Sequence, residues 1–137
     1  MAVVRIHHIK LSVVDIDRSL HFYRDLLGMK LLYDAERVNL PAYDQIIGYP
    51  GIKVRIAGVE DADGFMLFLM QFRNPPMQLR EAASYWQGSG GMSVEVDDIH
   101  AEYDRLTKAG VPSRSGPVKI ERDGKVVATA CYMSDPD

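Results

Sequence analysis

The chain has 137 residues, a size typical of one domain, and 47% of them are hydrophobic, which is enough to build a core. Its net charge of -3 argues against a nucleic-acid surface, which usually carries a basic excess. No apolar run approaches the roughly 18 residues of a membrane span, and no signal peptide is visible at the start. The single cysteine, Cys131, rules out an internal disulfide. We therefore expect a single-domain cytoplasmic protein that binds neither nucleic acid nor membrane.

The first half of the chain predicts a strand, a helix and three further strands. Residues 8–16 alternate apolar and other side chains, as a half-buried strand does, and Asp15 is a natural helix N-cap. Apolar residues then follow at helical spacing as far as Leu27, and Gly28 is expected to end the helix. Residues 38–51 are expected to form a loop long enough to act as a lid. The three further strands are predicted at 29–34, 52–59 and 65–72.

The second half repeats this pattern at an offset of 83 residues, the separation of Asp15 and Asp98. The alternating segment returns at 91–99, and a helix with Asp98 as its N-cap is expected to end at Gly110. Further strands are predicted at 111–113 and 126–133, with a hairpin turn at 121–124. Residues 74–89 are expected to be a linker with a short helix around 78–85.

The fold class that follows is α+β. We expect two tandem βαβββ modules that form a cupped mixed sheet around a cleft. The first module is assigned to residues 1–73, the linker to 74–89 and the second module to 90–137.

The stretch from His8 to Gly28 resembles the opening of a module of the vicinal oxygen chelate family, the glyoxalase/bleomycin resistance/dioxygenase proteins. It has the order His-hydrophobic-x-hydrophobic-x-Val-x-Asp, followed by Phe-Tyr-x-x-x-Leu-Gly. The end of the chain, Asp135-Pro136-Asp137, resembles the family's Asp-Pro-Asp-Gly turn. The resemblance implies paired modules around a U-shaped cleft, often in a homodimer. It also implies one more strand beyond Asp137, so we expect the second module to lack its last strand here.

The same resemblance implies four metal-ligand positions. The first maps to His8, which can ligate a divalent ion. The second maps to Phe68 and the third to Gly91, which have no donor atom in their side chains, and the fourth falls beyond Asp137. The cofactor therefore stays unknown; a divalent metal that uses His8 is one alternative, although most ligand positions are not filled.

Strand parity predicts which other side chains line the cleft. His8 and Glu95 are the catalytic candidates, as a proton-transfer pair across the two modules. The alternative is that Lys10 and Glu95 form a partly buried ion pair. The ligand-binding residues predicted by parity are Lys10, Ser12, Met66, Phe68, Met70 and Ser93, and Arg55 is added to them as a residue at the mouth of the cleft. Tyr85 and Trp86 in the linker are further aromatic side chains that could cover a ligand.

Two functions remain open. The first is a metal-independent protein that binds a small molecule in the cleft. The alternative is a lyase, isomerase or dioxygenase, either metal-dependent or using acid–base chemistry, that acts on a small oxygenated substrate. A third, plainer hypothesis is an interaction domain without a ligand cleft.

Overall fold

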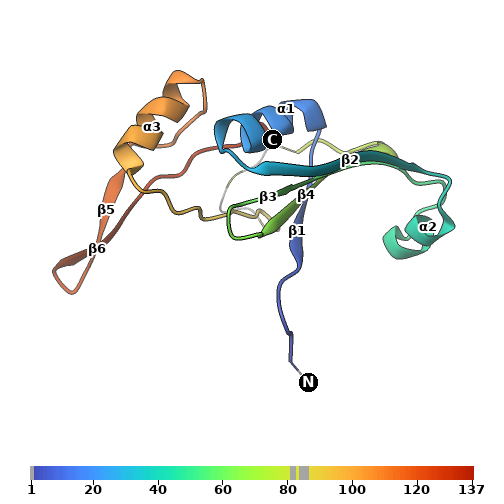
Figure 1. The fold of residues 1–137 in the computed structure, drawn as a ribbon, viewed down its shortest axis with the longest axis horizontal. Coiled ribbons are helices and arrows are strands. Elements are labelled where there is room, and N and C mark those ends of the chain that lie inside the picture. Colours follow the sequence, from blue (N-terminus) through green and yellow to red (C-terminus); the bar gives the residue numbers. More distant parts are fainter. Residues whose placement is uncertain (1, 81–82, 84–86) are drawn as a thin grey trace. The chain divides into compact units, whose positions relative to one another are not determined.

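A computed structural model of the chain describes residues 2–80, 83 and 87–137. Contacts between residues divide the chain into two compact units. One is Met1–Arg80 with Pro136, and the other is Glu81–Asp135 with Asp137. Figure 1 labels the α-helices and strands of both units. In the part of the chain that is described, no helix has the length and apolar character that crossing a membrane would require.

The first unit is built on a mixed four-stranded sheet in the order β1-β4-β3-β2 (Figure 1). β1 (His8–Ser12) pairs in parallel with β4 (Met66–Asn74). β3 (Lys53–Glu60) pairs antiparallel with both β4 and β2 (Lys30–Val38). The predicted strand-helix-strand-strand-strand order of this half is therefore confirmed, and the helical crossover after β1 is what parallel pairing requires.

The helix after β1 begins where the sequence predicts and changes its geometry after one turn. In α1 (Ile16–Leu20), the Asp15 carboxylate accepts hydrogen bonds from the amides of Asp17 and Arg18. The chain continues as the π-helix η1 (His21–Leu26), where turns are one residue wider. Gly28 follows with a φ of 74°, the left-handed conformation that favours glycine at a helix end.

Both faces of the sheet are packed in the first unit. On one face, α1 covers β3 and β4, and its Ile16 is fully buried with Leu67 and Leu69 of β4. On the other face, Ile52, Val54, Ile56 and Met70 form a smaller core cluster. Three partly buried side chains pack against that cluster: Tyr43, Ile47 and Phe72.

The segment expected to be a loop over 38–51 contains a helix, α2 (Pro41–Ile47), so that expectation was wrong. Pro41 stands at the first helical turn, where its missing N–H costs nothing, and Gly48 ends the helix with a φ of 76°. The Asp44 carboxylate accepts from the amides of Gly51 and Ile52 at 2.8 and 2.9 Å, respectively, which ties α2 to the start of β3.

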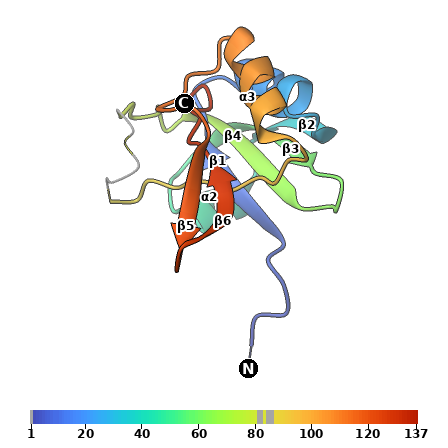
Figure 2. The same ribbon diagram turned by 90° about the vertical axis from the view of Figure 1, so that its left-hand side faces the viewer.

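The second unit contains α3 (Ile99–Lys108) and a hairpin of β5 (Val118–Arg122) and β6 (Lys125–Ala130). Figure 2 shows the two strands of this hairpin side by side. The predicted cap and turn are confirmed: Asp98 accepts from two amides of α3, and positive φ at Asp123 and Gly124 closes the hairpin. The strand predicted at 111–113 was wrong, because only Ser113 makes an isolated bridge, with Met133. The strand predicted at 126–133 ends at Ala130.

The strand expected at 91–99 is not formed, and residues 91–98 are exposed. In the first unit the corresponding strand, β1, has β4 as its partner. Among the described residues of the second unit, no strand equivalent to β4 follows β6. An alternating sequence needs a partner strand to satisfy its backbone groups, so this segment remains without strand pairing.

Candidate functional site

Two faces of the sheet carry different chemistry, and we name each by the helix that packs on it. The α1 face includes Arg55, Gln71 and the buried Leu67 and Leu69. The α2 face includes the side chains that alternate with these. Its members used below are His8, Lys10 and Ser12 of β1, Tyr33 and Arg37 of β2, Gly58 of β3, and Met66, Phe68, Met70 and Phe72 of β4. Six of the predicted ligand-binding and catalytic residues therefore share one face.

An aromatic row crosses the α2 face. The imidazole of His8 stacks on the Phe68 ring, with centroids 3.9 Å apart and planes 16° from parallel. The Tyr33 ring meets Phe68 edge-on at 5.6 Å. Between them, Gly58 leaves space on β3, since a Cβ there would lie 2.8 Å from Cε1 of Tyr33. The row thus connects side chains of β1, β4 and β2, and it passes over β3 at Gly58, which has no side chain.

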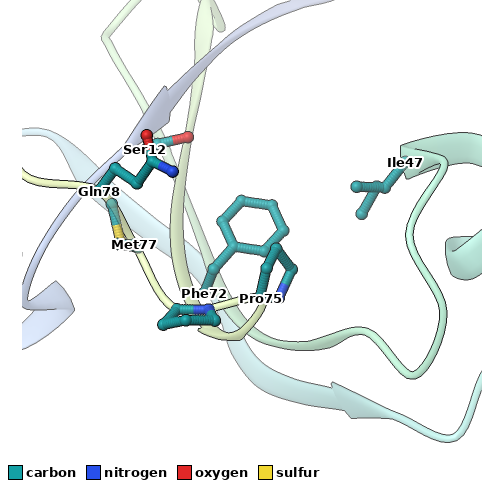
Figure 3. Close-up of a pocket in the computed structure, with 7 residues that line it drawn as sticks. Ser12, Ile47, Phe72, Pro75, Met77 and Gln78 are labelled. Carbon is teal, nitrogen blue, oxygen red and sulfur yellow. The ribbon is translucent and has the colours of Figure 1, made fainter.

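A hollow of about 260 Å³ lies beyond this row. Figure 3 shows Phe72 and Pro75 between Ile47 on one side and Ser12 and Gln78 on the other. The described residues that line the hollow are Ser12, Ile47, Phe72, Pro75, Pro76, Met77 and Gln78. Ser12 is a predicted ligand-binding residue, whereas Phe72 and Ile47 were missed. The signal for Phe72 was present, because it continues the period-two series of Met66, Phe68 and Met70.

The charged groups of the two faces differ in their partners. On the α2 face, Nζ of Lys10 lies 5.7 Å from the centroid of Phe72, and no carboxylate among the described residues lies within 4.0 Å of it. On the α1 face, Arg55 donates to both oxygens of Asp34 at 2.9 and 2.6 Å and to Asp17 at 2.8 Å. Arg55 on the α1 face is therefore neutralised by two carboxylates, while Lys10 on the α2 face has no carboxylate partner among the described residues.

Arg55 was predicted among the ligand-binding residues, and the structure places it on the α1 face, opposite the face of His8, Lys10 and Ser12. The reason is its position in β3, where it pairs with Gln71, whose side-chain oxygen accepts from the Ile16 amide at 3.0 Å. Hydrogen bonds from Arg55 hold the pKa of Asp34 and Asp17 below their usual range. Arg55 joins α1 to β2 and lies on the opposite face of the sheet from the predicted ligand-binding residues of β1 and β4.

The donor set around His8 does not fit a divalent metal centre. The β4 side chain that stacks on His8 is Phe68, which presents carbon to the imidazole. Among the described residues, His7 is a polar neighbour of His8, with the two Nδ1 atoms 2.9 Å apart. No group of three His, Cys, Asp or Glu side chains suited to a metal occurs in the described ranges. A metal site with the usual three or four protein ligands would need donors that the residues around His8 do not supply.

The remaining predicted site residues belong to the second unit. Ser93 and Glu95 lie in the exposed segment 91–98, which forms no strand, so strand parity does not define where their side chains point. Gly91 lies in the same segment, with open space where a Cβ would stand. Tyr85 and Trp86 fall outside the described residues.

Comparison with known proteins agrees with this architecture. Residues 5–137 match the family model of the Glyoxalase/Bleomycin resistance protein/Dioxygenase superfamily. The chain belongs to this superfamily. It is 29% identical over 136 residues to a lactoylglutathione lyase of Haemophilus influenzae, covering 98% of this chain and 87% of the relative. It is 30% identical to a probable lactoylglutathione lyase of Vibrio cholerae, covering 97% and 84%. The metallothiol transferase FosB of Lysinibacillus sphaericus is 28% identical, covering 100% and 79%.

The solved structures of this superfamily show the same fold. A glyoxalase family protein from Bacillus cereus aligns with a TM-score of 0.78 at 23% identity, covering 97% of this chain and 87% of its own. At that identity the likeness speaks for the fold alone. The α+β class with a mixed sheet, predicted from the sequence, is therefore confirmed for this superfamily member.

Proposed function

We propose that this superfamily member binds a small apolar or aromatic molecule on the α2 face, without a resident metal. The observation that carries the proposal is the stack of His8 on Phe68. A ring that covers an imidazole face provides a surface for dispersion and stacking, and it takes the place where a ligating oxygen would stand. His8, Tyr33 and Phe68 would form the wall, with Met66 and Met70 as adaptable neighbours.

The physical support is that other side chains cover the aromatic row only in part, although the neighbouring cluster under α2 is packed. Tyr33 is 36% exposed although its ring lies over Gly58 in the middle of the sheet. Burial of the remaining part raises the pKa of its phenol further above physiological pH, so Tyr33 is neutral, as tyrosines ordinarily are, and its hydroxyl can donate a hydrogen bond. An aromatic surface with a polar end is typical of small-molecule sites.

The test combines metal analysis with a binding titration on the purified protein. We expect less than stoichiometric Ni, Zn, Fe or Mn, and binding of the neutral fluorophore N-phenyl-1-naphthylamine. Tyr33→Ala should weaken that binding about tenfold, a loss in the upper range for an aromatic contact. Tyr132→Ala is the matched control, because Tyr132 is 72% exposed and belongs to the second unit. Stoichiometric metal, or no binding of the fluorophore, would refute the proposal.

A second candidate is an acid–base lyase or isomerase in which His8 and Glu95 transfer a proton. Its support is the similarity of this chain to relatives named as lactoylglutathione lyase and probable lactoylglutathione lyase. This candidate predicts exchange of the lactoyl α-proton of lactoylglutathione in deuterated water, lost in both His8→Ala and Glu95→Gln. If the α-proton exchanges no faster with the protein than in buffer alone, this candidate function is wrong and the binding proposal is unaffected.

We further propose that the protein is a cytoplasmic homodimer that does not bind nucleic acid. The edge position of β1 and the exposed Val3, Val4 and Ile6 ahead of it support self-association. Its net charge of -3 argues against nucleic-acid binding, and its single cysteine suits a reducing compartment. Light scattering after size exclusion tests the dimer, and cell fractionation tests the location. A mobility-shift titration with DNA and RNA tests the absence of nucleic-acid binding.

A further inference from the structure

We infer that the ligand of the α2 face is an anion with an apolar body, which occupies the hollow around Phe72 and has Lys10 as its counter-charge. This inference rests on the proposed function, and it names the class of ligand and a second contact region beyond the aromatic row.

The hollow selects for a small apolar group. Carbon dominates its wall, through Ile47 of α2, Phe72 of β4 and the prolines that follow (Figure 3). Its volume of about 260 Å³ is somewhat below the roughly 300–1,000 Å³ of sites that hold drug-sized molecules. One ring or a short alkyl chain therefore matches it better than a large polycyclic ligand.

The rim of the hollow adds a positive charge. Phe72 lines the hollow and also lies beneath Lys10, whose ammonium is 5.7 Å from the ring centroid. Lys10 and Ser12 are two residues apart on β1, so their side chains lie on the same face. An apolar group against Phe72 would therefore bring its polar end close to the ammonium and to the Ser12 hydroxyl.

The charged side chains of the sheet indicate that the polar end of the ligand is negative. The carboxylates of Asp34 and Glu36 on β2 are paired with Arg55 and Arg73. Arg37, which alternates with them on the α2 face, donates to the backbone carbonyl of Glu36, and no carboxylate among the described residues pairs with it. Glu60, which pairs with Met66 on the α2 face, has Lys30 as its partner. Among the described residues this leaves a cation without a carboxylate partner on each edge strand, Lys10 on β1 and Arg37 on β2. An anion would gain from this field, whereas a cation would be repelled.

The experiment uses two probes that differ in one group, 4-phenylbutyrate and 4-phenyl-1-butanol. Each is titrated into the isotope-labelled full chain, and the dissociation constant is taken from amide shifts of Phe72 and Met77. Both should bind, with the carboxylate about fivefold tighter than the alcohol, which corresponds to an exposed ion pair of favourable geometry. Salt at 1 M should abolish most of that difference.

Lys10→Gln should weaken 4-phenylbutyrate about fivefold and leave 4-phenyl-1-butanol unchanged, and Lys10→Arg should restore the preference. The matched control is Lys53→Gln, since Lys53 is an exposed lysine of β3 in the same sheet. If the alcohol binds and the carboxylate shows no Lys10-dependent advantage, the inference is wrong and the proposed function stands. An equal loss of both probes in Lys10→Gln also overturns it, because Lys10 would then act through packing on Phe72. If neither probe binds the unmodified chain, the proposed function falls with it.

Discussion

The imidazole of His8 and the ring of Phe68 are stacked 3.9 Å apart on neighbouring parallel strands. The strand register pairs His8 with Met66, so the stack is diagonal across the ladder and not between directly opposed residues. It joins the edge strand β1 to the middle of the sheet through side chains, in addition to the backbone hydrogen bonds. The same contact accounts for the poor fit of a metal at His8.

The stack should be measurable as a coupling between the two residues. In a double-mutant cycle of His8→Leu and Phe68→Leu, we expect a coupling free energy of about 1 kcal/mol from urea unfolding, typical of an aromatic pair. The cycle of His21→Leu and Phe68→Leu is the control, since His21 is exposed on η1. Additive single-mutant effects in the His8 cycle would mean that the stack contributes no stability.

Gly58 should tolerate no larger side chain while Tyr33 is present. Its added Cβ would lie 2.8 Å from Tyr33 Cε1, so Gly58→Ala should lower the free energy of unfolding by about 2 kcal/mol, in the range of overpacking. The double variant Gly58→Ala with Tyr33→Ala should recover part of this loss. Gly116→Ala is the control, because nothing lies within 4 Å of a Cβ there and its φ is not positive. A stable Gly58→Ala single variant would show that the ring of Tyr33 has room to move.

The ion pair of Arg55 with Asp34 should make stability depend on pH in the acid range. The pKa of Asp34 is lowered in the folded chain, chiefly by its hydrogen bond with Arg55. Its contribution to stability is therefore present above the unfolded carboxyl pKa, about 3.9, and is lost as pH falls through the lower folded value. Asp34→Asn should cost about 1 kcal/mol at pH 7, because the side chain is 29% exposed and solvent screens the pair.

The measurement is urea unfolding of both chains from pH 7 to pH 3. The difference between wild type and Asp34→Asn should shrink as pH falls below 4. Glu102→Gln serves as the comparison, since its pair with Arg105 is an i,i+3 contact on the exposed side of α3 and should be worth less than about 0.5 kcal/mol. A difference for Asp34→Asn that persists unchanged at pH 3 would contradict the role of charge.

The two equivalent N-caps should contribute equally to their helices. Each of Asp15 and Asp98 accepts from two amides of the first helical turn. Replacing either by alanine should cost about 1 kcal/mol, and replacement by asparagine should cost little, because its side-chain oxygen also accepts. Urea unfolding followed by circular dichroism gives the free energy of unfolding of the alanine and asparagine variants at each position. A loss in the asparagine variants as large as in the alanine variants would indicate that charge, and not the hydrogen bonds, is what matters.

Much of the first unit follows from local patterns in the sequence. The alternation before Asp15 and the helical spacing after it predict β1 and the helix, and the structure confirms both. The same parity places His8, Lys10 and Ser12 on one face with Phe68. The predicted loop over 38–51 was wrong because α2 has no side-chain cap to mark it in the sequence. Its Tyr43 and Ile47 pack against a core cluster that includes Met70 of β4, a contact that the local sequence does not show.

In the candidate site, too, some features follow from the sequence and others depend on contacts formed in the folded chain. Phe68 at the expected ligand position was visible in the sequence, but its stacking with His8 depends on the offset between parallel strands. Arg55 was misplaced because a long charged side chain finds its partners across space, here on α1 and β2. The hollow at Phe72 needs α2 and the segment after β4 to be packed together, which no local pattern specifies.

The sequence by itself determined the α+β class, the repeat marked by Asp15 and Asp98, and the lack of a donor at Phe68, because each depends on the identity and spacing of neighbouring residues. Only the tertiary structure decided which partners the strands obtained. β1 pairs with β4 and orders His8 against Phe68, whereas the equivalent segment at 91–98 remains unpaired. The physical reason is that a strand is completed by backbone hydrogen bonds from another strand, and alternation in one segment says nothing about whether that partner is in place.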